Sequence, residues 1–227
     1  MKKLIYFSFL LSVLVFFSNA ANSQITVSGS AGANGNYTSL TGIGGAFSAI
    51  NSGAQTGNNI VIAITGNALT ETGANALNSN DWLSFILKPA PAVTAVISGA
   101  NDSALISFDN ADNVTFDGSN NGTNTKDLII RNTGDGSAIR FINGASFDTL
   151  RSCIIESQTS SYGLGTIFFS TSAGLTGNSY NVISGCDVRD RSDLTGIPMP
   201  TNAIYSYGTV GLENSYNRIS GCNIFNM

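Results

Sequence analysis

Short segments in which apolar and polar residues alternate recur along most of this chain. A first set shares a central aliphatic residue, Leu105, Ile139, Ile167 or Ile204, at an equivalent place: SALISFDN (Ser103 to Asn110), SAIRFING (Ser137 to Gly144), GTIFFSTS (Gly165 to Ser172) and NAIYSYGT (Asn202 to Thr209). Each segment is bounded by Gly, Asn, Asp or Ser, which is typical of short, half-buried β-strands. We therefore expect an all-β chain.

A second motif interleaves with the first and sets a period. NSYNVISGCDV (Asn178 to Val188) returns 36 residues later as NSYNRISGCNI (Asn214 to Ile224). A looser copy is ASFDTLRSCII (Ala145 to Ile155), whose Cys153 lies 33 residues before Cys186. A weaker copy is ADNVTFDG (Ala111 to Gly118), in which we place Val114 opposite Leu150, 36 residues on. The chain therefore repeats every 33 to 37 residues.

A period of this length, with two or three short strands in each repeat, favours a coil that returns above itself. Like strands then pair in parallel, about 4.8 Å apart. DLIIRN (Asp127 to Asn132) supplies a third strand where the spacer allows it. A β-sandwich or propeller gives no reason for ISGC to recur at nearly constant spacing. We predict a right-handed parallel β-helix, with a cap and first coils over residues 24–102 and repeats over residues 103–227.

The segment from Ser39 to Asn51 has helical spacing instead. It places Leu40, Ile43, Phe47 and Ile50 on one face, so we predict a short amphipathic helix that caps the first coil. NIVIAIT (Asn59 to Thr65) and LSFILKP (Leu83 to Pro89) then begin the stack. No polar closing element follows the last repeat, and we expect the sequence to be a fragment of a longer protein.

The first 23 residues read as a signal peptide. Lys2 and Lys3 precede an apolar run from Leu4 to Phe17, and small polar residues follow. That run has 14 residues, against the roughly 20 that a membrane-spanning helix needs. No later segment is long and apolar enough to span a membrane, so we expect a secreted or outer-surface protein.

Composition narrows the choice of partners. Charged residues make up 11% of the chain, and removal of Lys2 and Lys3 takes the net charge from −4 to −6. A weakly acidic surface gives no electrostatic reason to bind nucleic acid or an anionic membrane. Both partners are disfavoured.

The repeats resemble those of the pectate-lyase-like superfamily of right-handed parallel β-helices, through the NxISGCxI copies, DNVTFDG and AIRFING. More narrowly, NIVIAITGN, NVTFDG and GTIFFSTS look like large secreted surface proteins that gliding bacteria export through the type IX system. The resemblance covers most of the mature chain. It implies a fold more than a function, because such repeats serve lyases, hydrolases, epimerases and adhesins.

Chemistry must rest on carboxylates, Lys or Arg, because the chain contains no His. The weak catalytic candidates are Asp187, Asp190, Asp193 and Arg189 in DVRDRSD, which we place in a loop after a strand. The resemblance makes this cluster a candidate, because related hydrolases use grouped Asp and related lyases use Ca²⁺-bound acids with a basic residue. We prefer a structural or ligand-contacting loop, because the charges alternate and neutralise one another.

A second acidic group, Asp109, Asp112 and Asp117, stands among Asn residues and could supply oxygen ligands to Ca²⁺. Its spacing matches no EF-hand or glycine-rich calcium repeat. We prefer turn chemistry to a metal site, because Asn and Asp tolerate left-handed backbone angles and bond neighbouring amides. No other cofactor is indicated.

Three ladders follow from the repeat. Cys153, Cys186 and Cys222 stand at one repeat position, as do Leu150, Ile183 and Ile219. Strand spacing would permit a disulfide, but we prefer a ladder of buried thiols. The third ladder comprises Phe147, Tyr180 and Tyr216. It is either an internal aromatic stack, which we prefer, or an exposed platform for sugar rings.

These features favour a non-catalytic, secreted or cell-surface protein for adhesion or polysaccharide contact. The alternatives are a polysaccharide lyase or glycoside hydrolase with part of its site elsewhere, and a structural stalk.

Overall fold

The computed structural model describes residues 23–196 and 198–227. The chain is built mostly of strands, and parallel sheets dominate, so the prediction of an all-β chain with parallel pairing is confirmed. All of the predicted signal peptide except Ser23 lies outside the described residues. Within the described ranges, no helix has the length and apolar character that a membrane span requires.

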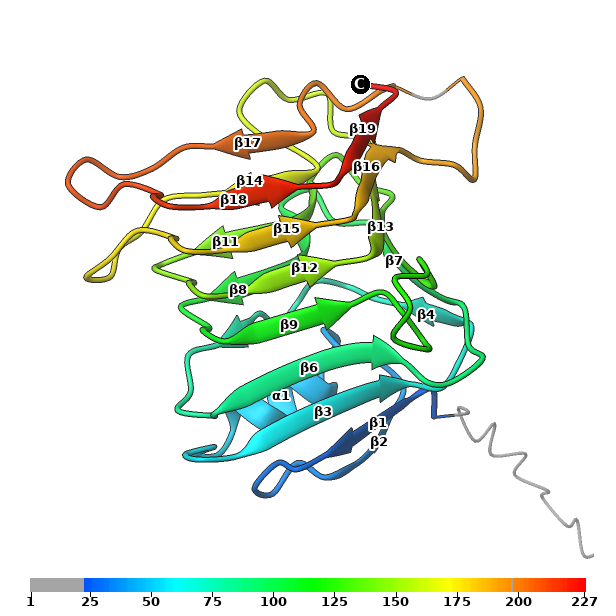
Figure 1. The fold of residues 1–227 in the computed structure, drawn as a ribbon, viewed down its shortest axis with the longest axis vertical. Helices are drawn as coiled ribbons and strands as arrows, with labels where there is room; N and C mark the ends of the chain where they lie inside the picture. The colour runs from blue at the N-terminus through cyan, green and yellow to red at the C-terminus, as the bar shows by residue number, and fades with distance from the viewer. Residues whose placement is uncertain (1–22, 197) are drawn as a thin grey trace, which may run out of the picture.

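The strands form three sheets, here called A, B and C (Figure 1). Sheet A comprises β1 (Ile25–Ser28), β2 (Gly35–Tyr37), β3 (Asn59–Ile64), β6 (Ser84–Pro89), β9 (Val114–Asp117), β12 (Thr149–Arg151), β15 (Val182–Ser184) and β18 (Arg218–Ser220). Sheet B comprises β4 (Ala68–Thr70), β7 (Ala95–Gly99), β10 (Leu128–Asn132), β13 (Cys153–Ser157), β16 (Asp187–Asp190) and β19 (Asn223–Phe225). Sheet C comprises β5 (Leu77–Asn78), β8 (Ala104–Asp109), β11 (Ser137–Ile142), β14 (Ile167–Phe169) and β17 (Ile204–Ser206).

From β3 onward the chain enters sheets A, B and C in strict rotation. Each strand from β6 to β19 therefore pairs in parallel with the strand three places before it in the sequence. In Figure 1 the strands β3, β6, β9, β12, β15 and β18 lie one above another. Two strands depart from this order, because β1 pairs antiparallel with both β2 and β3 at one edge of sheet A. The sequence repeat gave no sign of this antiparallel edge.

Register follows the repeat, with two corrections. Leu150 pairs with Ile183, which pairs with Ile219. However, Leu150 also pairs with Phe116, so our placement of Val114 opposite Leu150 was wrong by two residues. Likewise Ile139 pairs with Ile106, and the assignment of Leu105 to that rung was wrong by one residue.

The core lies between the sheets and repeats from rung to rung. Aliphatic side chains from all three sheets are fully buried, and burial of each contributes roughly 1.5–3 kcal/mol. Aromatic rings fill the space between sheets C and A, where Phe108 packs edge-on against Phe116 and Phe141. Phe141 stacks on Phe169, with ring centroids 4.7 Å apart.

The predicted N-terminal helix is shorter than its apolar pattern suggested. Helix α1 spans Ala46–Asn51 and buries Phe47 and Ile50 in the core. Ile43 is 98% exposed, so its predicted place on the buried face was wrong. It stands in a turn before the helix, where Gly44 has a φ of 70° that no helix accommodates. Leu40 is nevertheless buried in the apolar core, and its backbone N–H donates to the carboxylate of Glu71.

Candidate binding groove

The connections from sheet C to sheet A carry the most unusual backbone in the molecule. The same position in four successive connections adopts a left-handed conformation, with φ between 57° and 61°: Asn113, Phe147, Tyr180 and Tyr216. Asn tolerates this region, but a bulky aromatic residue rarely adopts it, and the cost is roughly 1–2 kcal/mol per residue. Strain of this kind in a repeated position is a reason to look for a function.

The left-handed backbone turns the three aromatic side chains outward. Phe147 is 57% exposed, Tyr180 is 48% exposed and Tyr216 is 76% exposed. The preferred expectation of an internal aromatic ladder was therefore wrong. The rings are stacked, with centroids 5.1 Å and 4.9 Å apart and interplanar angles of 1° and 11°. Stacked pairs of this kind contribute about 0.5–1.5 kcal/mol each, which offsets part of the backbone strain.

Side-chain hydrogen bonds fasten each of these connections to its neighbours. The Asn217 side chain accepts from the backbone N–H of Asn181, whose own side chain accepts from the N–H of Asp148, both at 2.9 Å. The Ser position works in the opposite direction, because Ser179 Oγ accepts from the N–H of Ser215 at 2.9 Å. Ser146 Oγ likewise accepts from the N–H of Ser179. The Asn and Ser residues of the NSYN motif thus form hydrogen bonds between successive connections, on either side of an exposed aromatic ring.

A groove of about 360 Å³ runs along these connections. Four successive turns contribute the residues that line it: Asn110 and Asp112, then Gly144, Ser146 and Phe147, then Thr176, Gly177, Ser179 and Tyr180, and finally Ser215 and Tyr216. The aromatic ladder borders it, and the polar ladder of Asp112, Ser146, Ser179 and Ser215 lies beside the rings. Because the rings stack on one another, they present mainly their edges along the groove.

Asp112 is the only carboxylate that lines this groove among the described residues. Burial raises its pKa, and a hydrogen bond from the backbone N–H of Ser146 to Oδ1, at 2.9 Å, opposes the rise. Its other oxygen, Oδ2, receives no hydrogen bond from the described residues. A hydrogen bond from an earlier segment also holds the Asp112 backbone, because Trp82 Nε1 donates to its carbonyl oxygen at 2.6 Å.

Asp148 lies directly after the ladder residue Phe147 and is almost completely buried. Its Oδ1 accepts from the backbone N–H of Val114 at 2.8 Å, whereas its Oδ2 is buried without a hydrogen-bond partner. Burial raises its pKa well above the usual range, and the nearby charge of Asp112 adds to the rise. A buried carboxylate with one unpaired oxygen is most stable as the neutral acid.

The three residues considered for Ca²⁺ each have other contacts. Asp109 Oδ1 accepts from Asn143 Nδ2 at 2.6 Å, and Asp117 pairs with Arg151 at 2.7 Å. Asp112 lines the groove instead. Within residues 23–196 and 198–227, no group of three or more His, Cys, Asp or Glu side chains is arranged to hold a metal ion. Calcium binding remains the untested alternative to the turn role that we prefer for these residues.

The acidic cluster DVRDRSD lies in sheet B and in the loop after it, and not at the connections from sheet C to sheet A. Asp187, Arg189 and Asp190 belong to β16, so their placement in a loop was wrong, whereas Asp193 does lie in the following loop. Asp187 pairs with Lys126, and Asp190 accepts from Asn226. None of these residues lines the groove.

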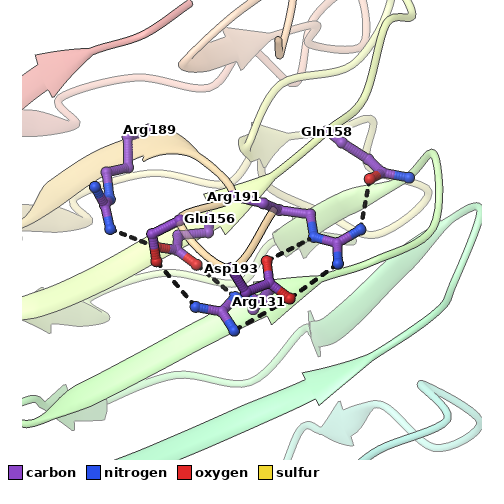
Figure 2. Close-up of polar contacts among 7 residues, drawn as sticks. Arg131, Glu156, Gln158, Arg189, Arg191 and Asp193 are labelled. Atoms are coloured by element: carbon purple, nitrogen blue, oxygen red, sulfur yellow. Dashed lines mark hydrogen bonds and ion pairs between the residues drawn. The ribbon is translucent and has the colours of Figure 1, made fainter. Parts of the chain in front are cut away.

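An ion-pair network joins the loop after β16 to the outer face of sheet B (Figure 2). Arg191 contacts Asp193 at 3.0 Å and Gln158 at 2.6 Å, and Arg131 also contacts Asp193, at 3.4 Å. The hydrogen bond from Arg191, with help from the charge of Arg131, lowers the pKa of Asp193. Burial opposes a similar change at Asp187, but hydrogen bonds and charges, chiefly from Lys126, lower its pKa. Neither group is a proton donor near neutral pH.

Glu156 is the centre of this network, and the sequence reasoning missed it. It is fully buried on β13 and contacts Arg131 of β10 at 2.6 Å and Arg189 of β16 at 2.9 Å. These three residues occupy paired positions on adjacent strands. The sequence repeat could have indicated this contact, because it aligns Glu156 with an arginine on each neighbouring strand.

The three cysteines are free thiols at one position of successive windings. Cys153 and Cys186 are buried, and Cys222 is partly exposed. A hydrogen bond with the Cys153 thiol, together with burial, raises the pKa of Cys186 to about 12. A thiol held in this way is a poor nucleophile.

Comparison with protein families, curated proteins and solved structures found no match to this chain. The groove is therefore interpreted from its own geometry and chemistry.

Proposed function

We propose that this chain is an exported, non-catalytic protein that uses the groove beside Phe147, Tyr180 and Tyr216 to contact polysaccharide at or outside the cell surface. The proposal includes closure of the three sheets into a right-handed parallel β-helix, as in pectate-lyase-like repeats, and export by the type IX route. The strict rotation of strands among sheets A, B and C supports such a winding. The observation that carries the function is a groove lined by the same residue types in successive turns.

A polymer with a repeating unit suits a surface with a repeating unit. Successive turns are about 4.8 Å apart, so three of the four turns that line the groove each offer one Ser and one aromatic group at nearly constant spacing. The phenol hydroxyls of Tyr180 and Tyr216 make no hydrogen bond with the described residues, and both side chains are exposed at the groove, where sugar hydroxyls can reach them. Contact with ring edges adds apolar area without the face-on stacking that free aromatic rings provide.

Cleavage of the polysaccharide is less well supported than binding. Glycoside hydrolysis uses two carboxyl groups that flank the bond, one of them a proton donor. Asp112 alone lines the groove among the described residues, and Asp187 and Asp193 have lowered pKa values outside it. A purely structural stalk would account for the sheets but not for strained, exposed rings.

The test replaces the rings without disturbing the turns. Asn113 already occupies the ladder position with a φ of 60°, so Tyr180→Asn and Tyr216→Asn should keep the left-handed backbone. We expect the double variant to lose most of the binding seen on a polysaccharide array and in affinity electrophoresis.

Tyr162 supplies the matched control, because it is 86% exposed and lies outside the groove. Tyr162→Asn should bind as the unmodified chain does. Equal binding by the double variant and by the unmodified chain would remove the groove from the proposal. Absence of binding to any polysaccharide would remove the function, and reducing-sugar release would favour the catalytic alternative.

A further inference from the structure

The charge of the groove points to the kind of sugar polymer it accepts. Among the described residues that line it, Asp112 has the only carboxyl group, and no Lys or Arg is among them. No ion pair among the described residues involves Asp112. The groove therefore holds a carboxyl group that has no cationic partner among the described residues.

We propose that the groove binds an uncharged polysaccharide, with Asp112 accepting hydrogen bonds from sugar hydroxyls. This inference rests on the proposed function and narrows its ligand. It runs against the acidic polymers that a pectate-lyase-like resemblance implies, because a uronate would bring a second negative charge into a partly buried site.

The polar groups of the groove are of the kind that hydrogen-bonds to sugar hydroxyls. Asp112 Oδ2 is a free acceptor, because the Ser146 N–H occupies Oδ1. The phenols of Tyr180 and Tyr216 can both donate and accept. A carboxylate that accepts from a neutral hydroxyl forms a charge-assisted hydrogen bond, and this bond does not require a cation in the ligand.

The experiment measures selectivity at pH 7.5 by affinity electrophoresis and calorimetry. The probes are hydroxyethyl cellulose and galactomannan as neutral polymers, polygalacturonate as an acidic polymer, and chitosan oligosaccharide as a cationic one. We expect at least one neutral polymer to bind about tenfold or more tightly than polygalacturonate. Adding salt should narrow this difference, because salt screens the repulsion.

Asp112→Asn keeps an oxygen for the Ser146 N–H and replaces the free acceptor with a donor. Neutral binding should weaken roughly three- to tenfold, the range of one hydrogen bond, while binding to polygalacturonate should strengthen. Asp81→Asn is the control, because it makes the same charge change at an exposed position outside the groove. It should leave both affinities unchanged.

The outcomes separate this inference from the function on which it rests. Preferential binding of polygalacturonate or chitosan, abolished by Tyr180→Asn and Tyr216→Asn, would overturn the neutral ligand while keeping the groove. Neutral binding that Asp112→Asn leaves intact would also overturn it. Failure to bind any of the four polymers would remove the proposed function itself. If Asp112→Asn folds poorly, the selectivity of the unmodified chain decides the question.

Discussion

Replacing Asp148 with Asn should stabilise the protein near neutral pH. Asp148 takes the motif place that Asn181 and Asn217 hold in the next two turns. There the Asn Nδ2 groups donate to the carbonyl oxygens of Ala145 and Asn178, at 3.0 Å and 2.9 Å. By the same geometry, the amide of Asp148→Asn reaches the carbonyl of Ala111, where a carboxylate oxygen now lies unpaired.

The magnitude follows from two effects. A new hydrogen bond contributes about 0.5–1.5 kcal/mol, and relief of a buried unpaired oxygen contributes about 1–3 kcal/mol. The two overlap, so we expect a net gain of about 2 kcal/mol. For a domain of this size, that corresponds to a rise in Tm of about 4–8 °C.

The gain should depend on pH in a defined direction. Burial raises the pKa of Asp148 in the folded chain above its unfolded value of about 3.9. The folded state therefore binds the proton more tightly, and the unmodified protein loses stability as pH rises from about 4 through the raised pKa. The folded chain keeps the proton up to the raised pKa, whereas the unfolded chain loses it above about pH 4. The advantage of the variant should therefore grow from about pH 4 upward and disappear below it, where both states are protonated.

Thermal and urea unfolding between pH 4 and pH 8.5 measure this difference. Asn181→Asp is the matched reverse change, and it should lower stability near neutral pH while the loss shrinks in acid. Equal stability of Asp148→Asn and the unmodified chain at pH 8, or a gain that does not change with pH, would refute the assignment of Asp148 as a neutral acid.

Two further predictions concern buried acids. Glu71 is buried and accepts four hydrogen bonds, each 2.7 Å long, from Ser39, Leu40 and Thr41. Glu71→Gln should cost about 2–4 kcal/mol in urea unfolding, because the amide replaces one of the two acceptor oxygens with an NH2 group that donates and cannot accept from these donors. Glu156→Gln should cost about 2–4 kcal/mol by leaving two partly buried arginines without their shared partner, and the loss should show little dependence on salt. A cost below about 1 kcal/mol for either variant would contradict the role assigned to that acid.

The repeat predicted the parallel register because identical residues recur at equivalent positions of the two best copies. Asn, Ser, Ile and Cys recur at one spacing in the two best copies, and the paired strands follow that spacing. The register was misplaced at Val114, where the motif is weak and alternation alone does not distinguish Val114 from Phe116. The helix was overextended for a related reason, since the spacing of Ile43 fits a helix while its glycine neighbours do not.

The groove was harder to predict than the fold. Aromatic residues in a repeat are most often buried, and only backbone conformation turns Phe147, Tyr180 and Tyr216 outward. Asn113 at the same position was the available signal, because Asn favours left-handed backbone. The burial of Glu156 could not be read from its own segment, since it depends on two arginines supplied by other strands.

The two-way hydrogen bonding of the NSYN turns also bears on how the chain assembles. Asn181 fastens to the turn before it, while Ser179 receives a bond from the turn after it. A winding that slipped by a single residue would lose both bonds and the ring stack in one step. A misaligned intermediate therefore has a higher free energy than the native state. The NSYN turns thus favour the native register in a chain whose near-identical segments could otherwise pair in several ways.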